Sequence, residues 1–291
     1  MQLFVDDLTV IDFSYLCTQR GIVGESWIVD VLLDGSLNEM SMVLDFAVVK
    51  KQIKAIIDDA VDHKLLLPIQ EQAVTLADSP HNDGHQTIDF ISDAASYYLQ
   101  SPACAFASID CLTITIPAVT KHLTTIILSH LPDNVKGLTL VLRPENIPTD
   151  YYHYTHGLKL HDGNCQRIAH GHRSKVVVFE NQQESIKWQE YWANRWCDIY
   201  IGSTEDIVDA SETVFSMPDG DAEQHHVFAY ESSQGRFELA IPKAESEMMD
   251  TDTTVECLAQ YMADEHKRMT ADSDFKVLAY EGVGKGAIAF A

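Results

Sequence analysis

Apolar positions along the chain follow two different periods. Runs rich in β-branched and aromatic residues at 8–16 and 26–33 predict two strands near the N-terminus. Apolar residues spaced three and four apart from Phe46 to Val61 predict an amphipathic helix, which must end before Pro68. The polar stretch 70–90 predicts a loop.

The remaining segments repeat a similar order of elements. After a short helix at 88–99, a strand, a helix and a strand are expected at 106–115, 117–130 and 138–142. The elements expected in the second half are strands 151–160 and 175–179, helix 183–197, loop 204–224, strands 225–231 and 235–241, helix 252–267, and strands 275–280 and 286–290. Such repetition predicts an internal duplication, with modules 1–148 and 149–291 joined at PENIPTD, residues 144–150.

Tryptophans recur along one face of the helix expected at 183–197. Trp188, Trp192 and Trp196 follow one another at every fourth position. A stripe of this kind is more typical of a buried core than of a cofactor site, so these side chains are expected to pack inside the second module.

The net charge of the chain argues against two classes of binding partner. The chain has 291 residues, 46% hydrophobic and 22% charged, and a formal net charge of −24. Nucleic acids and anionic membrane surfaces both need clustered cations, so neither is expected as a partner. We expect a cytoplasmic protein with reduced thiols, because the six cysteines form no CxxC pair and the N-terminus lacks a secretory pattern.

One short stretch concentrates chemistry. Residues 161–174 read HDGNCQRIAHGHRS. Alternation along a strand would place His170 and His172 on one face, and His156 lies on the preceding strand. Three histidines with an open fourth position are typical of a catalytic zinc site, although an HxH pair alone is more often a pair of ordinary polar side chains. His153 and His161 fit better as solvated groups or as supports of the ligands.

Cys165 lies within the same stretch and has three interpretations. The thiolate is a fourth metal ligand, or a base or nucleophile activated by a neighbouring cation. The third interpretation is a structural thiol, which a polar loop containing glycine disfavours.

These residues resemble the 6-pyruvoyl-tetrahydropterin synthase and 6-carboxy-tetrahydropterin synthase family, a branch of the tunnelling fold. The second module carries the family's histidine strand as Tyr152 to His156, its loop as Cys165-Gln-Arg-Ile-Ala-His170-Gly-His172, and its late strand ending in Glu281. The first module carries Ser41-Met-Val-Leu-Asp-Phe46, the following helix, and Asp62-His63.

The family pattern is divided between the modules. In the first module Cys17 stands at the first histidine, and Val23-Gly24-Glu25 replaces His-Gly-His. In the second module Cys197-Asp198 stands near the expected Asp-His pair. Cys165 and His170 are also one residue further apart than is usual in the family. These complementary losses predict one composite site per chain, built where modules meet.

The resemblance implies a fold, an assembly and a cofactor. The fold is α+β: tandem tunnelling-fold modules with antiparallel sheets and helices on one face, which associate through sheet edges into a barrel as a homo-oligomer. The cofactor is Zn²⁺, held by His156, His170 and His172.

The resemblance also implies a reaction on a small-molecule pterin. Dihydroneopterin triphosphate would be converted by a lyase-type reaction to a 6-carboxy product, for queuosine-type synthesis, or to a 6-pyruvoyl product, for tetrahydrobiopterin. Cys165 would remove a proton, His63 oriented by Asp62 would relay protons, and Glu281 would bind the pterin. The alternative is a non-catalytic pterin- or purine-binding homologue with a structural metal. Without the resemblance, Asp62-His63 is a polar pair at a helix end and Glu281 a solvated carboxylate.

Overall fold

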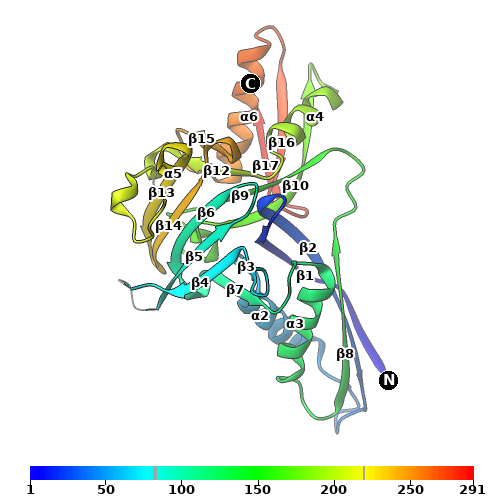
Figure 1. The fold of residues 1–291 in the computed structure, drawn as a ribbon. Helices are drawn as coiled ribbons and strands as arrows, with labels where there is room; N and C mark the ends of the chain where they lie inside the picture. The colour runs from blue at the N-terminus through cyan, green and yellow to red at the C-terminus, as the bar shows by residue number, and fades with distance from the viewer. Residues whose placement is uncertain (81–83, 219) are drawn as a thin grey trace.

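The first half of the chain forms a mixed sheet in the computed structural model, which describes residues 1–80, 84–218 and 220–291 (Figure 1). Its strand order is β7-β3-β1-β2-β8. The first two strands, β1 and β2, form a long antiparallel hairpin, as the sequence predicts. Strand β3 runs parallel to β1, and β7 runs parallel to β3. The bounds are β1 Gln2–Cys17, β2 Gly21–Gly35, β3 Leu65–Pro68, β7 Phe106–Ile109 and β8 Val135–Pro144.

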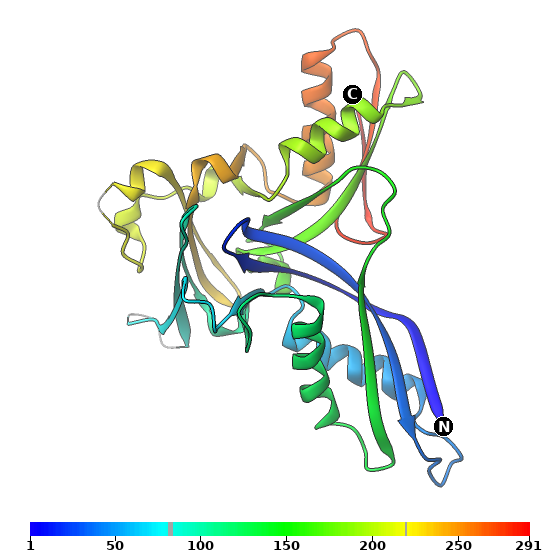
Figure 2. The same cartoon turned by 45° about the vertical axis from the view of Figure 1, so that its right-hand side comes forward.

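Helices cover one face of this sheet (Figure 2). One helical segment runs through α1 (Phe46–Val48), a π-helical turn (Val49–Ile53) and α2 (Lys54–Ala60), and the second helix is α3 (Ile116–Leu128). Asp45 caps the first segment, because its carboxylate accepts the Ala47 N–H at 2.6 Å. Both helices lie where the apolar spacing predicts them, and their buried apolar residues pack against β1, β2 and β8.

The second half repeats this arrangement. Its sheet has the order β15-β12-β9-β10-β16-β17, with α4 (Ile186–Arg195) and α6 (Val255–Met269) on one face (Figure 2). Trp188, Trp192 and Trp196 are buried there, which confirms the expected core stripe. The bounds are β9 Tyr151–His156, β10 His170–Glu180, β11 Gln183–Glu184, β12 Ile199–Ser203, β15 Ser246–Met249, β16 Phe275–Tyr280 and β17 Gly286–Phe290.

The matching strand orders confirm the α+β fold with tandem modules. In both halves a central antiparallel hairpin is flanked on one side by two parallel strands and on the other by an antiparallel strand. The sheets are therefore mixed, whereas the sequence-based expectation was of antiparallel sheets. The strand β12 follows α4 directly, and its parallel pairing with β9 is not visible in local sequence periodicity.

A third sheet joins the two halves (Figure 2). Its order is β13-β14-β6-β5-β4, so strands from both halves pair in one sheet. The loop expected at 70–90 and the helix expected at 88–99 are wrong, because these residues form strands. His81, Asn82 and Asp83 lie outside the described residues. The bounds are β4 Val74–Asp78, β5 His85–Ile91, β6 Ser96–Pro102, β13 His225–Ser232 and β14 Gly235–Pro242, and the short helix α5 (Asp221–Gln224) directly precedes β13.

The β1–β2 hairpin packs across the β9–β10 pair, and two glycines permit this contact. A Cβ on Gly24 would lie 2.0 Å from the Tyr154 carbonyl oxygen, and one on Gly171 would lie 2.6 Å from the Gly24 Cα. No side chain fits at such distances. The backbones of the two halves therefore meet directly beside the histidine-rich loop.

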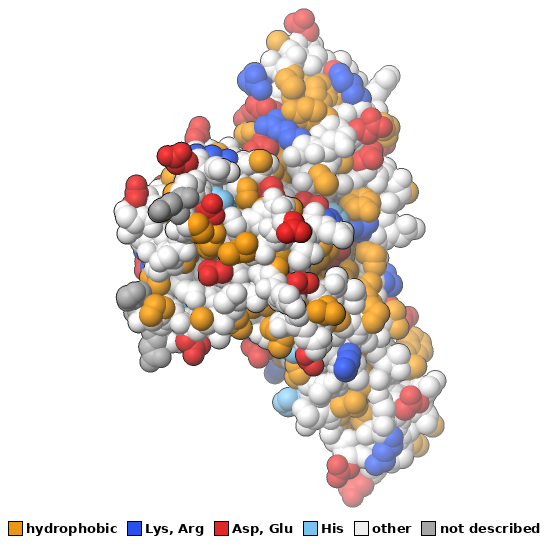
Figure 3. Space-filling model, in the orientation of Figure 1, with side chains coloured by type: hydrophobic (Ala, Val, Ile, Leu, Met, Phe, Trp, Pro, Cys, Tyr) orange, Lys and Arg blue, Asp and Glu red, His pale blue; other side chains and the backbone are white. Residues whose placement is uncertain are grey.

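The surface matches the acidic composition. Acidic side chains are spread over the face visible in Figure 3. Within the described part of the chain, no helix is both long and apolar enough to cross a membrane.

Candidate metal and catalytic site

Three histidines meet at the adjoining ends of β9 and β10. His156 is paired in register with His170, and His172 follows two residues along the same strand. All three side chains are fully buried, and one ring nitrogen from each lies within 4.8 Å of the others. The strand alternation thus brings the three predicted residues together.

Hydrogen bonds fix the protonation of two of these rings. His156 Nδ1 lies 2.9 Å from the Thr253 carbonyl oxygen, and His170 Nδ1 lies 2.9 Å from the Arg167 carbonyl oxygen. A carbonyl only accepts, so each Nδ1 carries the proton and each Nε2 keeps a free lone pair. Burial, with the charges of neighbouring histidines, holds the pKa of both rings well below the usual range, which keeps them neutral.

The Nε2 atoms of all three histidines are buried and have no hydrogen-bond partner among the described residues. Leaving such an acceptor unpaired costs about 1–3 kcal/mol. Neutral imidazoles that donate Nδ1–H to the protein and converge on one point through Nε2 are the usual arrangement of metal ligands. The donor set could therefore hold a metal ion.

Two carboxylates flank His172. Its Nδ1 lies 3.2 Å from Asp12 Oδ1, and its Nε2 lies 3.8 Å from Glu281 Oε1. Lys285 Nζ lies 3.2 Å from Asp12 Oδ2 and 3.7 Å from Glu281 Oε2. Burial raises the pKa of Asp12, but the opposing effects of His172, Lys285 and a Ser26 hydrogen bond bring it below the usual range. Glu281, predicted from the sequence, thus lies beside the histidines.

Cys165 and Asp62-His63 approach the same histidines from two different modules. Ligand atoms of His63, Cys165 and His170 all lie within 4.8 Å of one another. The His63 Nδ1–H donates to Asp62 Oδ2 at 2.6 Å. Burial alone would lower the pKa of His63, but Asp62 and Cys165 raise it to about 10. One chain therefore brings together all seven residues expected from the sequence.

The turn after α2 orients the Asp62-His63 pair. His63 adopts a left-handed backbone conformation with φ of 53°. Its N–H donates to the Asp12 carbonyl oxygen at 2.6 Å, and Asp62 Oδ1 accepts the Asp12 N–H at 2.9 Å. These bonds to β1 direct the His63 ring toward the three histidines. A polar pair at a helix end that faced solvent would not need such bonds.

The β13–β14 hairpin supports the loop that carries Cys165. Gln234 Nε2 donates to Asn164 Oδ1 at 2.9 Å, and Arg167 Nε donates to Gln234 Oε1 at 3.1 Å. Tyr230 Oη donates to the Gln166 carbonyl oxygen at 2.7 Å. The residues on both sides of Cys165 are therefore held by the third sheet.

The corresponding position in the first module lacks ligands. The β1–β2 register places Val23 opposite Tyr15 and Cys17 opposite Gly21. If Val23 stands for His170, as the sequence comparison assumed, the equivalent of His156 is therefore Tyr15 and not Cys17. Within the described residues, both groups of three or more ligand-type side chains close enough to hold a metal lie at the histidine site.

Sequence reasoning missed several residues around the site, above all Asp12 and Lys285. Asp12 gave one signal, a lone carboxylate within the apolar run Val-Ile-Asp-Phe of β1. Lys285 follows the glycines of the turn between β16 and β17, and its sequence gave no comparable signal.

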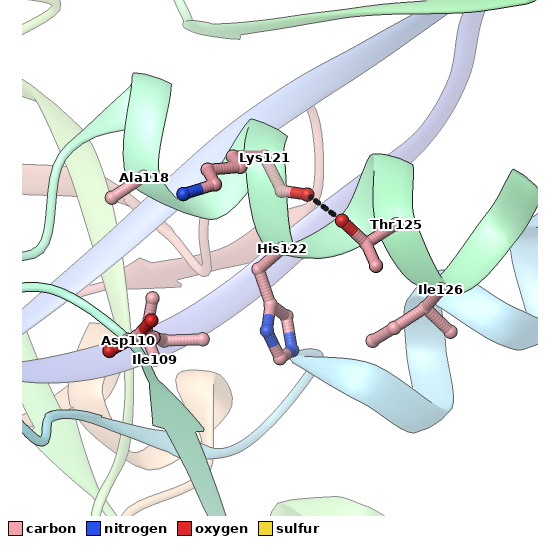
Figure 4. Close-up of a pocket in the computed structure, with 7 residues that line it drawn as sticks. All are labelled: Ile109, Asp110, Ala118, Lys121, His122, Thr125 and Ile126. Carbon is pink, nitrogen blue, oxygen red and sulfur yellow. Dashed lines mark hydrogen bonds between the residues drawn. The ribbon is translucent and has the colours of Figure 1, made fainter.

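A separate pocket lies between α3 and the end of β7 (Figure 4). Its polar side chains are those of Asp110, Lys121, His122 and Thr125 among apolar neighbours. Burial and the nearby Lys64 lower the pKa of His122. This pocket contains none of the predicted residues, so we place the candidate site at the histidines.

Comparison with known proteins finds a family model that matches part of the chain. The family model described as 6-pyruvoyl tetrahydropterin synthase matches residues 18–104. The resemblance to this family is confirmed. The matched residues contain Asp62-His63 and end before the histidine-rich loop. The match supports a function of the pterin-synthase type.

Solved structures of the same family are also similar to this chain. The 6-pyruvoyl tetrahydropterin synthase of Plasmodium vivax has 14% identity and a TM-score of 0.38, with 49% of this chain and 97% of that chain covered. The Plasmodium falciparum enzyme has 12% identity, with the same TM-score and coverage. No curated protein matches the sequence.

Proposed function

We propose that this protein is a zinc-dependent pterin synthase that acts on dihydroneopterin triphosphate and gives a 6-carboxy- or 6-pyruvoyl-tetrahydropterin. One observation carries the proposal: three buried histidines with unpaired Nε2 atoms lie beside a cysteine and an Asp-His pair. A metal-assisted proton transfer next to a carbonyl or hydroxyl group requires metal ligands, a base and a proton donor, and these residues could supply all three.

His156, His170 and His172 would hold the metal. Three neutral imidazoles and an open fourth position suit zinc. Zinc bound there would polarise the oxygen atoms of the substrate side chain and make the adjacent carbon more acidic. All three ligand side chains are fully buried, which limits the access of water to the metal position.

The remaining residues would move protons and position the substrate. Cys165 as thiolate would take a proton from the side-chain carbon next to the pterin ring. His63, held by Asp62 and protonated at neutral pH by its raised pKa, would stabilise that thiolate and donate protons. Glu281 would accept hydrogen bonds from the N–H groups of the pterin.

The proposal also covers the oligomeric assembly, the cellular location and the use of the product. Modules 1–148 and 149–291 would associate with further copies through free sheet edges into a barrel, as a cytoplasmic homo-oligomer. Its product would enter queuosine-type or tetrahydrobiopterin synthesis.

One observation favours a second candidate, a non-catalytic pterin- or purine-binding homologue with a structural metal. The loop from Cys165 to His170 is one residue longer than in the family. A base moved by about 1 Å can lose about a hundredfold in rate.

Incubation with dihydroneopterin triphosphate separates these candidates. Zinc-loaded protein should release triphosphate and form a 6-carboxy- or 6-pyruvoyl-tetrahydropterin, identified by mass spectrometry. Cys165→Ala should lose this activity, whereas Cys197→Ala, at an exposed thiol, should retain it. Zinc-loaded protein that binds a pterin without turnover would favour the binding homologue.

A further inference from the structure

Asp12 connects the two halves of the site, although it belongs to neither predicted motif. It lies in β1 of the first module, and its side chain is 3% exposed. A buried carboxylate is costly unless several partners stabilise its charge. The identity of these partners indicates what Asp12 does.

The side chain of Asp12 faces the second module. Oδ1 accepts the Ser26 hydroxyl at 2.5 Å and lies 3.2 Å from His172 Nδ1, whereas Oδ2 lies 3.2 Å from Lys285 Nζ. A carboxylate beside Nδ1 favours the proton on that nitrogen, which leaves the His172 Nε2 lone pair free. For His156 and His170, backbone carbonyls from their own module have this role.

The backbone of Asp12 binds the other half of the site. Its N–H donates to Asp62 Oδ1 at 2.9 Å, and its carbonyl oxygen accepts the His63 N–H at 2.6 Å. One residue thus fixes the Asp62-His63 turn through its main chain and a metal-site histidine through its side chain. Arg167 makes the converse connection from the second module, because its guanidinium donates to the Asp62 and His63 carbonyl oxygens at 3.4 Å and its own carbonyl oxygen accepts the His170 Nδ1–H.

We propose that Asp12 is a positioning residue that holds His172 in the tautomer with its proton on Nδ1, across the module interface, and so raises the metal affinity of the histidine site. The inference rests on the metal site of the proposed function. In the structure His172 Nδ1 has the carboxylate at 3.2 Å without a hydrogen bond of good geometry. A bound cation would make the His172 N–H a stronger donor, so its attraction to the carboxylate should increase when metal binds.

Zinc affinity tests this role without any substrate. Competition with a chromophoric chelator should give about tenfold weaker binding for Asp12→Asn and up to about a hundredfold weaker binding for Asp12→Ala. Asp12→Asn has the size of the original side chain and leaves the main-chain bonds to Asp62 and His63. If Asp12→Ala does not fold, the zinc affinity of Asp12→Asn therefore still tests the proposal. The matched control is Asp30→Asn on the neighbouring strand, because Asp30 binds Arg143 and the Asp7 N–H and no histidine.

Thermal unfolding of the metal-free proteins separates positioning from stability. A purely structural role predicts a lower melting temperature with wild-type zinc affinity in the folded Asp12 variants, and that result would overturn the inference. Wild-type protein that holds no zinc would overturn both the proposed metal site and this inference. Tight zinc binding that depends on Asp12, with no turnover of the pterin, would uphold the inference while the proposed reaction fails.

Discussion

His266 is fully buried in α6, where its ring lies 4.5 Å from that of Trp188 and 4.8 Å from that of Phe275 between centroids. Its Nε2 accepts the Trp192 indole N–H at 2.6 Å, so the proton of the neutral ring is on Nδ1. Burial lowers the pKa of His266 to about 4, against the opposing charges of Glu180 and Glu265.

This shift predicts a loss of stability in mild acid. In the unfolded chain a histidine has a pKa of about 6.5. Between pH 6.5 and about 4 the unfolded chain binds a proton that the folded chain excludes, so the free energy of unfolding falls as the pH falls. Above pH 6.5 the ring is neutral in both states and contributes no pH dependence.

Urea unfolding across this pH range should show a flatter dependence for His266→Gln, which keeps an acceptor for Trp192 and cannot take up the proton. His130→Gln, at an exposed histidine, should follow the wild-type curve. Equal slopes for His266→Gln and wild type would contradict the assignment.

At the scale of residues, the sequence predicts the site residues that lie close together along the chain. It misses those that only the tertiary fold brings to the site. His170 and His172 converge because strand alternation places i and i+2 on one face, and His156 because it lies in the adjoining strand. Asp12 is far from them in sequence, and only the crossing of the two hairpins brings its carboxylate to His172. No periodicity within β1 distinguishes it from a solvated carboxylate.

At the scale of elements, the third sheet explains a wrong prediction and also supports the loop that carries Cys165. Residues 70–99 carry scattered polar positions, and β6 is paired with β14 from the other half of the chain. Since strand stability depends on such pairing partners, local composition indicated a loop and a helix where strands form. The same sheet carries the turn that holds the Cys165 loop.

Gln234 in that turn should control the placement of Cys165. Its side chain binds Asn164 and Arg167, on either side of the thiol. Gln234→Ala removes both bonds and should loosen the loop, so that Cys165 reacts about tenfold faster with iodoacetamide, as followed by peptide mass spectrometry. A small displacement of the thiol should also cost about tenfold or more in product formation.

The zinc content of Gln234→Ala provides an internal check that the metal site is intact. His170 and His172 lie on β10 and should bind metal as in the wild-type protein. The matched control is Gln260→Ala on α6, where the side chain binds Asp264. Unchanged alkylation of Cys165 in Gln234→Ala would mean that the hairpin does not position the loop.

At the scale of the whole molecule, the chain contains two similar sheets with different chemistry. The five strands of the first sheet have counterparts in the same order in the second, and the ligand clusters combine His63 of the first half with histidines and Cys165 of the second. The sequence predicts this division through complementary losses of motif residues. It does not predict that both halves of the site come from the same chain, because that depends on how the hairpins β1–β2 and β9–β10 cross.

The crossing makes a definite prediction for mixed subunits. His63 and His170 have ring centroids 5.2 Å apart within one chain, and Cys165 lies with them. A chain with Cys165→Ala and a chain with His63→Ala each lack one part of their own site. When these proteins are dissociated, mixed and reassembled, with exchange verified by native mass spectrometry of differently tagged chains, pterin synthase activity should stay at the level of the two unmixed variants. Recovered activity would instead place Cys165 and His63 of the working site on different chains, which would require the hairpins to exchange between subunits.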